Sequence, residues 1–150
     1  MAMNWQITDE AELNKIVTFL EGEYQNQANQ TAFVLALHGD LGAGKTTLVQ
    51  HLAKQLGVSE IVTSPTFVIM KVYSGDKAAV NLVHIDAYRI ENIDEMRVLG
   101  FEALLQKKDT IICIEWAENI KELLPENTKH LSITMEGQIR HLTYSDKHGN

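Results

Sequence analysis

The segment that most restricts the fold of this chain is a glycine-rich stretch between an apolar run and an amphipathic run. Residues 39–46 have the sequence Gly-Asp-Leu-Gly-Ala-Gly-Lys-Thr, which matches G-x-x-x-x-G-K-[ST] at every fixed position. Residues 32–37 before it are all apolar, as in a strand buried on both faces of a parallel sheet. Apolar residues then recur at helical spacing before Gly57, at Leu48, Val49, Leu52, Ala53 and Leu56. Strand, glycine loop and helix in this order predict an α/β fold with a phosphate-binding loop.

The chemistry of phosphate binding explains each fixed position of this loop. Glycines let the backbone curl until its N–H groups face phosphate oxygens, and the following helix adds its positive end. Lys45 would reach the β- and γ-phosphates, and the Thr46 hydroxyl would ligate Mg²⁺. We therefore expect bound ATP and Mg²⁺, with nucleotide contacts from Gly39, Asp40, Leu41, Gly42, Ala43, Gly44, Lys45, Thr46 and Thr47.

The choice of ATP over GTP depends on a missing motif. Guanine-specific proteins with this loop carry an N-K-x-D segment. The nearest stretch here, Asn127-Thr128-Lys129-His130, has the wrong order and no Asp. The sequence therefore favours ATP.

The remaining patterns extend the α/β prediction over residues 1–150 as a single domain. Asp9 and Glu12 resemble a capping box before an amphipathic helix, and a helix over 93–106 should break near Gly100. A short helix is expected over 118–124, and strands are expected at 4–7, 67–73, 80–85, 110–114, 130–135 and 139–145. Short connections within 67–85 and 130–145 indicate antiparallel hairpins. We expect a P-loop NTPase three-layer sandwich whose central sheet is mostly parallel, with antiparallel hairpin additions.

Charge and composition restrict the partners and the compartment. The chain has 13 Lys plus Arg against 20 Asp plus Glu, a net charge of −7. An acidic domain binds nucleic acid poorly by itself, because neutralising phosphates requires a basic face. Cys113 is the only cysteine, and neither a signal peptide nor a membrane-spanning run is evident. We expect a cytoplasmic protein that binds neither membrane nor DNA.

Two carboxylates follow or end apolar strands, where parallel sheets present side chains to ligands. Glu115 follows the run 110–114 and is the expected second ligand of Mg²⁺, the alternative being a solvated carboxylate. Asp86 ends the run 82–85 and would hold a metal-bound water or orient the attacking water, unless it only caps a turn. Ser64 and Thr66 could sense the γ-phosphate as a switch, although Ser-Pro-Thr is also ordinary turn chemistry.

Other polar residues near these motifs have simpler explanations. Arg89 and Arg97 could stabilise transferred phosphate, but exposed or salt-bridged arginines are commoner. No third ligand lies at zinc-like spacing from His84, which favours a partly buried strand histidine. We expect structural roles for His38 and Cys113.

Several motifs in series resemble the TsaE family, formerly called YjeE. They are L-H-G-D-L-G-A-G-K-T-T-L at 37–48, S-P-T-F at 64–67, H-I-D-A-Y-R at 84–89, the stretch 95–100 and I-E-W-A-E at 114–118. The family's usual H-F-D-x-Y-R has Ile85 in second place here, a conservative change. The similarity extends over roughly residues 8–145.

The resemblance implies an ATP-hydrolysing accessory subunit that makes threonylcarbamoyladenosine in tRNA together with TsaB and TsaD. It implies contact with tRNA only through that complex. Carried onto this sequence, it implies that Thr46 and Glu115 bind magnesium and that Lys45, Thr66, Asp86 and Glu115 form the catalytic site. It further implies that Trp116 couples nucleotide state to the partners, and that Thr8 and Glu10 belong to the adenine pocket.

Two other functions would use the same loop. A small-molecule P-loop kinase would normally carry an arginine-bearing lid, whereas this chain has only Arg89 and Arg97 between the loop helix and Glu115. A non-hydrolysing ATP sensor would differ only in whether Glu115 and Asp86 activate water. The sequence does not separate the ATPase from the sensor.

Overall fold

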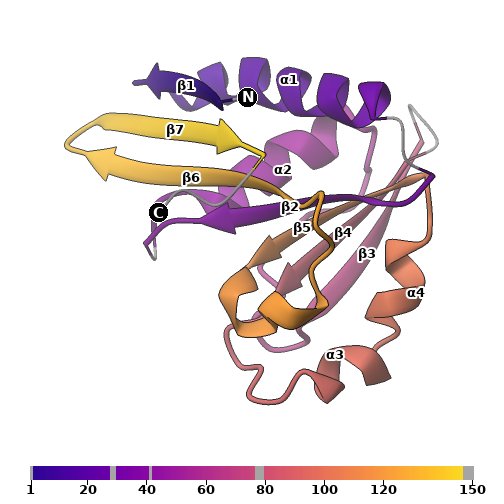
Figure 1. Cartoon of the computed structure of the whole chain (residues 1–150). Coiled ribbons are helices and arrows are strands. Elements are labelled where there is room, and N and C mark those ends of the chain that lie inside the picture. The colour runs from indigo at the N-terminus through magenta and orange to yellow at the C-terminus, as the bar shows by residue number, and fades with distance from the viewer. Residues whose placement is uncertain (1, 28–29, 41, 77–79, 147–150) are drawn as a thin grey trace.

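The computed structural model describes residues 2–27, 30–40, 42–76 and 80–146. These residues form a seven-stranded sheet in the order β1-β7-β6-β2-β5-β4-β3, drawn in Figure 1. The strand order differs from the chain order because β2 lies between β5 and β6, which follow each other in the chain. The chain therefore crosses over between parallel strands, as in α/β folds. This arrangement confirms the predicted α/β class.

The centre of the sheet consists of four parallel strands. β2 (Phe33–His38) pairs on one side with β5 (Thr110–Glu115) and on the other with β6 (Lys129–Glu136). β4 (Val80–Asp86) pairs in parallel with β5 and places Asp86 opposite Glu115. The strands thus bring two predicted site carboxylates to the same edge of the sheet.

Antiparallel strands complete the sheet at both sides. β3 (Met70–Gly75) forms a hairpin with β4, and β7 (Ile139–Ser145) forms one with β6. β1 (Ala2–Ile7) then adds antiparallel to β7. Both predicted hairpins are confirmed, and in the described part of the chain only β3 and β7 run against the common strand direction.

Helices cover both faces of this sheet and make the predicted three layers (Figure 1). α1 (Leu13–Asn26) and α2 (Lys45–Gln55) pack on one face, in a core that includes Leu20, Leu52 and Cys113. On the other face, Met96 of α3 (Asp94–Val98) and Phe101 of α4 (Phe101–Leu105) pack in a second core. In β2, β4 and β5, alternate residues pack in the two cores, because neighbouring side chains of a strand point to opposite faces.

The predicted helix boundaries have clear physical causes. Asp9 and Glu12 form the expected capping box around the short 3-10 helix η1 (Glu10–Glu12), which leads into α1. Hydrogen bonds from the backbone N–H groups of Thr8 and Asp9 lower the pKa of Glu12. Gly100, with φ +81°, separates α3 from α4 as expected.

Two sequence predictions need correction. The strand expected over 67–73 begins only at Met70, because the N–H groups of Val68 and Ile69 both donate to the carbonyl of Pro65 and close a turn. The helix expected over 118–124 is a 3-10 helix, η2 (Ala117–Leu123), because Ile120 has φ −128° and interrupts regular α-helical geometry.

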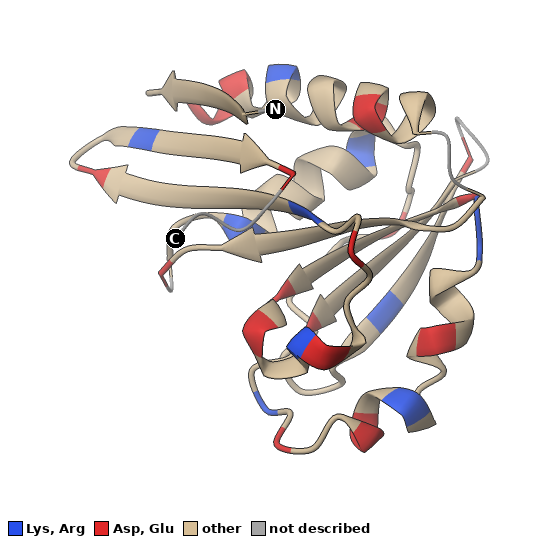
Figure 2. Cartoon of the chain, in the orientation of Figure 1, with Lys and Arg blue, Asp and Glu red and all other residues tan. Residues whose placement is uncertain are grey.

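Charge is spread over the whole molecule in the view of Figure 2, where basic segments are scattered among acidic ones. Acidic residues outnumber basic ones over the chain, 20 against 13. Among the described residues, no helix is sufficiently long and apolar to cross a membrane.

Candidate nucleotide-binding site

The glycine-rich loop leaves the end of β2 and curls back into the N-terminus of α2. Gly42 and Gly44 have φ +84° and +103°, which a residue with a side chain rarely adopts. A β-carbon at Gly39 would collide with the carbonyl oxygen of Ile133 in the adjacent strand β6. Glycine is therefore needed at these positions for the backbone conformation and for the close approach of β6. Leu41, a predicted nucleotide contact, lies outside the described residues.

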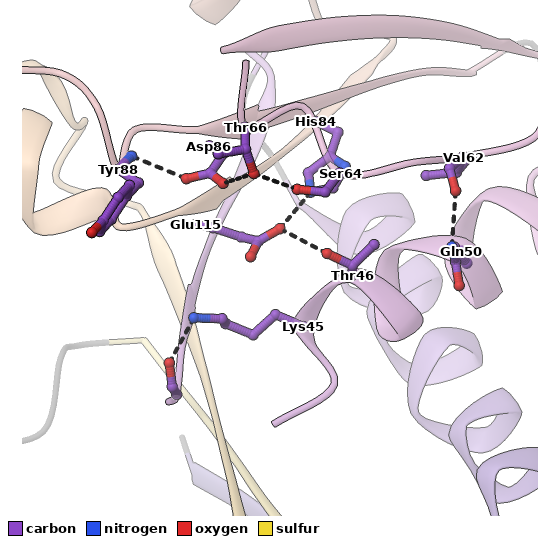
Figure 3. A network of polar contacts seen from close by, with 11 residues as sticks. Lys45, Thr46, Gln50, Val62, Ser64, Thr66, His84, Asp86, Tyr88 and Glu115 are labelled. Atoms are coloured by element: carbon purple, nitrogen blue, oxygen red, sulfur yellow. Dashed lines mark hydrogen bonds and ion pairs between the residues drawn. The ribbon is translucent and has the colours of Figure 1, made fainter. Parts of the chain in front are cut away.

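Lys45 is the first residue of α2, and its side chain folds back along the loop. Its Nζ donates a hydrogen bond of 2.6 Å to the carbonyl oxygen of Gly39, and the residue is buried (Figure 3). The same Nζ lies 5.2 Å from the centroid of the Trp116 ring. The ammonium group is thus held within the loop, where it faces the space above the helix N-terminus.

Glu115 is the last residue of β5 and lies beside the first turn of α2. It shares the sheet face of Cys113, which packs in the core under α1 and α2. Its Oε2 accepts a hydrogen bond of 3.3 Å from Thr46 Oγ1. The predicted pair of magnesium ligands is therefore adjacent, with two oxygen atoms of the kind that Mg²⁺ prefers.

His84 holds the same carboxylate from the neighbouring strand β4. Its Nε2 lies 2.8 Å from Glu115 Oε2, and the residue is fully buried, so the expectation of a partly buried histidine is wrong. His84 Nδ1 is buried without a hydrogen-bond partner among the described residues. The ring of His84 therefore holds the Glu115 carboxylate in one orientation. A usable sequence signal was the two-residue spacing from Asp86, which puts both side chains on one strand face.

Asp86 and Thr66 form a second polar group across the cavity (Figure 3). Asp86 Oδ2 accepts 2.9 Å from Thr66 Oγ1, and its Oδ1 accepts 3.0 Å from the N–H of Tyr88. Ser64 Oγ lies 2.7 Å from Thr66 Oγ1. Asp86 therefore caps the turn that follows β4, while its other oxygen faces Thr66; its role in positioning water stays a prediction.

A strained turn fixes the position of Thr66. Ile69 has φ +70°, which is unusual for a β-branched residue. Its carbonyl accepts a 2.8 Å hydrogen bond from the N–H of Asp86, and its own N–H donates to the Pro65 carbonyl at 2.6 Å. This turn connects the Thr66 segment directly to the end of β4.

Trp116 closes one side of the cavity. It has φ +59° at the junction between β5 and η2, and its ring lies 5.1 Å from the Tyr88 ring, centroid to centroid. Tyr88 is 58% exposed, and Phe67, directly after Thr66, is 85% exposed. Apolar surface thus lies next to the polar groups of the cavity.

These residues enclose a cavity of about 320 Å³. Its lining is Gly42, Gly44, Lys45, Thr46, Thr47, Ser64, Thr66, Asp86, Glu115 and Trp116. One ammonium group therefore faces two buried carboxylates, a poor environment for a bare polyphosphate. A divalent cation at Thr46 and Glu115 would balance this charge, and Mg²⁺ commonly uses one or two carboxylates together with phosphates and water. The residues present thus fit Mg²⁺ with a nucleotide.

Other predicted residues lie outside this cavity. Asp40 and Ala43 line a neighbouring cavity against Ile133, Thr134 and Met135 of β6. Thr8 and Glu10 line a third, with Arg140, and Glu10 Oε1 lies 3.1 Å from His51 Nε2. Neither Arg89 nor Arg97 lines the first cavity. Arg89 lies over the Phe67 ring, whereas Arg97 pairs with Asp94 and Glu102.

His38 and Cys113, both expected to have structural roles, have different surroundings. His38 Nε2 lies 2.9 Å from His130 Nδ1 in a stacked pair next to the glycine-rich loop. Cys113 is fully buried, and burial raises the pKa of its thiol to about 12, with a further contribution from the charge of Glu115. Cys113 is therefore a protonated core residue rather than a nucleophile.

Comparison with known proteins supports one family. The family described as "Threonylcarbamoyl adenosine biosynthesis protein TsaE" matches residues 7–142. The tRNA threonylcarbamoyladenosine biosynthesis protein TsaE of Streptomyces coelicolor is 41% identical over 116 residues, covering 73% of this chain and 77% of that protein. The protein of the same name from Bacillus subtilis is 40% identical over 113 residues, covering 75% and 68%.

A solved structure has the same fold. The crystal structure of Bacillus subtilis YdiB superposes with a TM-score of 0.69 at 29% sequence identity. The superposition covers 96% of this chain and 84% of YdiB. The mixed sheet described above is therefore similar to an experimentally determined one.

Proposed function

This chain belongs to the TsaE family, and on that premise we propose that it is an ATP-hydrolysing accessory subunit of tRNA threonylcarbamoyladenosine synthesis. The observation that carries the proposal is the convergence on one cavity of the loop lysine, the Thr46–Glu115 pair and the Thr66–Asp86 pair. A phosphate-binding loop alone would serve many nucleotide-binding proteins. The two carboxylates, each held by hydrogen bonds, supply what hydrolysis needs in addition.

In nucleotide binding, the phosphates and the Mg²⁺ would each be held by a separate set of residues. Backbone N–H groups of residues 42–47 and the N-terminus of α2 would cradle the phosphates, and Lys45 would leave the Gly39 carbonyl to contact them. Thr46 and Glu115 would hold Mg²⁺, which when bound neutralises charge on the β- and γ-phosphates. His84 keeps Glu115 turned toward Thr46.

In hydrolysis, Asp86 would position the attacking water. Glu115 Oε2 already accepts from Thr46 and His84, which suits a metal ligand. Asp86 is held by Thr66 and by the Tyr88 N–H, and it lines the cavity from the opposite strand end. Water positioned there would attack the γ-phosphorus and break its bond to the β–γ bridging oxygen, giving ADP and phosphate. Lys45 would stabilise the charge on the transferred group.

The surface around the site supports a dependence on partner proteins. Trp116 contacts Tyr88 beside the cavity, and the exposed Tyr88 and Phe67 adjoin Asp86 and Thr66. A protein bound there would sense nucleotide state through these residues. We propose that TsaB and TsaD are those partners, that tRNA is contacted only through them, and that the protein works in the cytoplasm.

Release of phosphate from Mg-ATP tests this function. The purified chain is assayed alone and then with its TsaB and TsaD counterparts. Strong stimulation by the pair is the expected result, and Lys45→Ala should abolish turnover. Glu115→Ala should mainly remove the Mg²⁺-dependent part. Full activity in both variants would exclude the scheme, and binding of ATP without turnover under every condition would favour a nucleotide sensor.

A further inference from the structure

The peptide unit between Ala87 and Tyr88 lies between the Asp86 carboxylate and an asparagine from a distant part of the chain. On one side, the Tyr88 N–H donates a 3.0 Å hydrogen bond to Asp86 Oδ1 (Figure 3). On the other side, the Ala87 carbonyl accepts a 2.9 Å hydrogen bond from Asn119 Nδ2. A peptide unit is planar, and in its usual trans form the C=O and N–H point in opposite directions. A rotation of this unit would therefore change both hydrogen bonds at once.

The other contacts of Ala87 do not fix this peptide plane from outside the turn. Its own N–H donates 2.9 Å to the carbonyl of Glu115, but that N–H belongs to the preceding peptide unit. Its carbonyl also accepts 3.1 Å from the N–H of Ile90, which closes the turn over 87–90. Ile90 belongs to the same turn and would move with it. Asn119 is therefore the contact that ties the plane to another element.

Asn119 comes from a well-anchored segment. It lies on η2 and is partly buried, and its neighbours Ala117 and Ile120 pack in the second core. Its backbone N–H donates 3.1 Å to the carbonyl of Trp116, which lines the first cavity. Asn119 thus connects one wall of the cavity with the turn that follows β4.

η2 and this turn also meet through two aromatic rings. The Tyr88 ring lies 5.1 Å from the Trp116 ring, centroid to centroid, but Tyr88 is 58% exposed. An exposed ring can turn about its side-chain bonds without moving its own peptide. The hydrogen bond from Asn119 acts on the backbone directly. It is therefore the contact that determines the orientation of the Ala87 carbonyl.

We propose that Asn119 is a positioning residue for hydrolysis, which fixes the Ala87–Tyr88 peptide and through it the Asp86 carboxylate. Without Asn119, the Ile90 N–H would still satisfy the Ala87 carbonyl, so the fold is kept while the peptide gains freedom to rotate. A displacement on the order of 1 Å in a reacting group can slow a reaction by about a hundredfold. The inference rests on the proposed function and deepens it by linking a wall of the cavity to the residue that positions water.

Steady-state phosphate release from Mg-ATP tests the inference, with the full chain alone and with saturating TsaB and TsaD. Asn119→Leu has a similar shape without the donor, and Asn119→Asp turns a carboxylate oxygen toward the Ala87 carbonyl. Both should lower the maximal rate by about tenfold or more. The affinity for Mg-ATP, measured by calorimetry, should stay within about twofold. Asn119→Asp carries the test if Asn119→Leu does not fold.

Lys121→Leu is the matched control, because it places the same residue at an exposed position of η2. Its maximal rate should equal that of the wild type under both conditions. An effect of the η2 surface on partner binding would lower the rate of this control as well. An equal loss in Lys121→Leu would therefore overturn the inference.

A double substitution separates positioning from a general structural effect. If Asn119 acts through Asp86, then Asn119→Leu should change the rate by less than about twofold in an Asp86→Asn background. The same loss in both backgrounds, or a wild-type maximal rate in both Asn119 variants, would overturn the inference and leave the proposed function intact. No phosphate release by the wild-type chain under either condition would overturn both.

Discussion

Glu115 shows how few atoms position the site. One oxygen, Oε2, accepts from Thr46 Oγ1 and from His84 Nε2, so α2 and β4 both hold the side chain. Asp86 is also held by few contacts: Oδ1 accepts from the N–H of Tyr88 in the turn, and Oδ2 accepts from Thr66 Oγ1. Each carboxylate therefore has a fixed orientation, and the role of each can be tested by substituting one residue.

Substitution of His84 should change the metal dependence of the protein. His84→Phe fills the same buried space without the donor to Glu115 and removes the buried, unpartnered Nδ1. The Mg²⁺ concentration for half-maximal ATP hydrolysis should rise by about tenfold, as for loss of a group that orients a metal ligand. Thermal unfolding should change little. His141→Phe, on β7, is the control, and an unchanged Mg²⁺ dependence in His84→Phe would contradict this role.

Substitution of Asp86 should affect turnover more than binding. Asp86→Asn keeps an oxygen for the Tyr88 N–H but cannot accept a proton from water. The maximal rate of phosphate release should fall by about a hundredfold or more, while the affinity for Mg-ATP stays within about threefold. Rapid phosphate release by the variant would show that another group positions the water.

At the level of elements, the site is the meeting point of β2, β4, β5 and α2. The apolar runs 32–37 and 110–114 allowed both central strands to be predicted, and the glycine motif located the loop between β2 and α2. Alternation along β4 and β5 then explains why His84, Asp86 and Glu115 share the face of α2. The register that sets Asp86 opposite Glu115 depends on contacts between distant segments, so local patterns did not contain it.

Other features could not be predicted from the sequence, because they too depend on contacts that local patterns do not contain. The turn at 65–69 ends the predicted strand early through hydrogen bonds to one carbonyl, that of Pro65, and through the unusual φ of Ile69. Arg140 reaches Gly44 only because β7 returns beside β1 and β6. No spacing in the sequence connects residues 44 and 140.

The burial of β5 predicts a dependence of stability on alkaline pH. Burial, aided by the charge of Glu115, raises the pKa of Cys113 from 9.0 to about 12. Between these values the unfolded chain loses the thiol proton while the folded chain keeps it, so the free energy of unfolding should fall as pH rises. Below pH 9 this contribution is constant.

Cys113→Ala removes that titration and provides the comparison. In urea unfolding between pH 9 and 11, the wild-type free energy should decline more steeply than that of the variant, by at most about 1.4 kcal/mol per pH unit. The alanine should lower stability similarly at every pH, so the slope is the measured quantity. The buried Tyr144 hydroxyl, whose pKa is also raised, contributes to both proteins equally. Equal slopes would contradict a buried, protonated thiol.

For the whole molecule, the net charge of −7 predicts that the isolated chain binds tRNA poorly. Fluorescence anisotropy with labelled tRNA at 150 mM salt should show no binding by the isolated chain up to about 20 µM, because an acidic chain neutralises few phosphates. Binding should appear only when TsaB and TsaD are added. Tight binding by the isolated chain, with a steep salt dependence, would exclude contact with tRNA solely through partners.

Isothermal titration calorimetry of the wild-type chain and of Lys45→Ala with Mg-ATP decides whether residues 39–46 hold the nucleotide. Lys45 lies inside the loop and its Nζ donates to the Gly39 carbonyl, so its removal should act on the loop first. Saturable one-to-one binding by the wild-type chain, weakened at least about tenfold in Lys45→Ala, is the expected result. Equal affinities in the two proteins, or no heat of binding in the wild type, would contradict nucleotide binding at this loop.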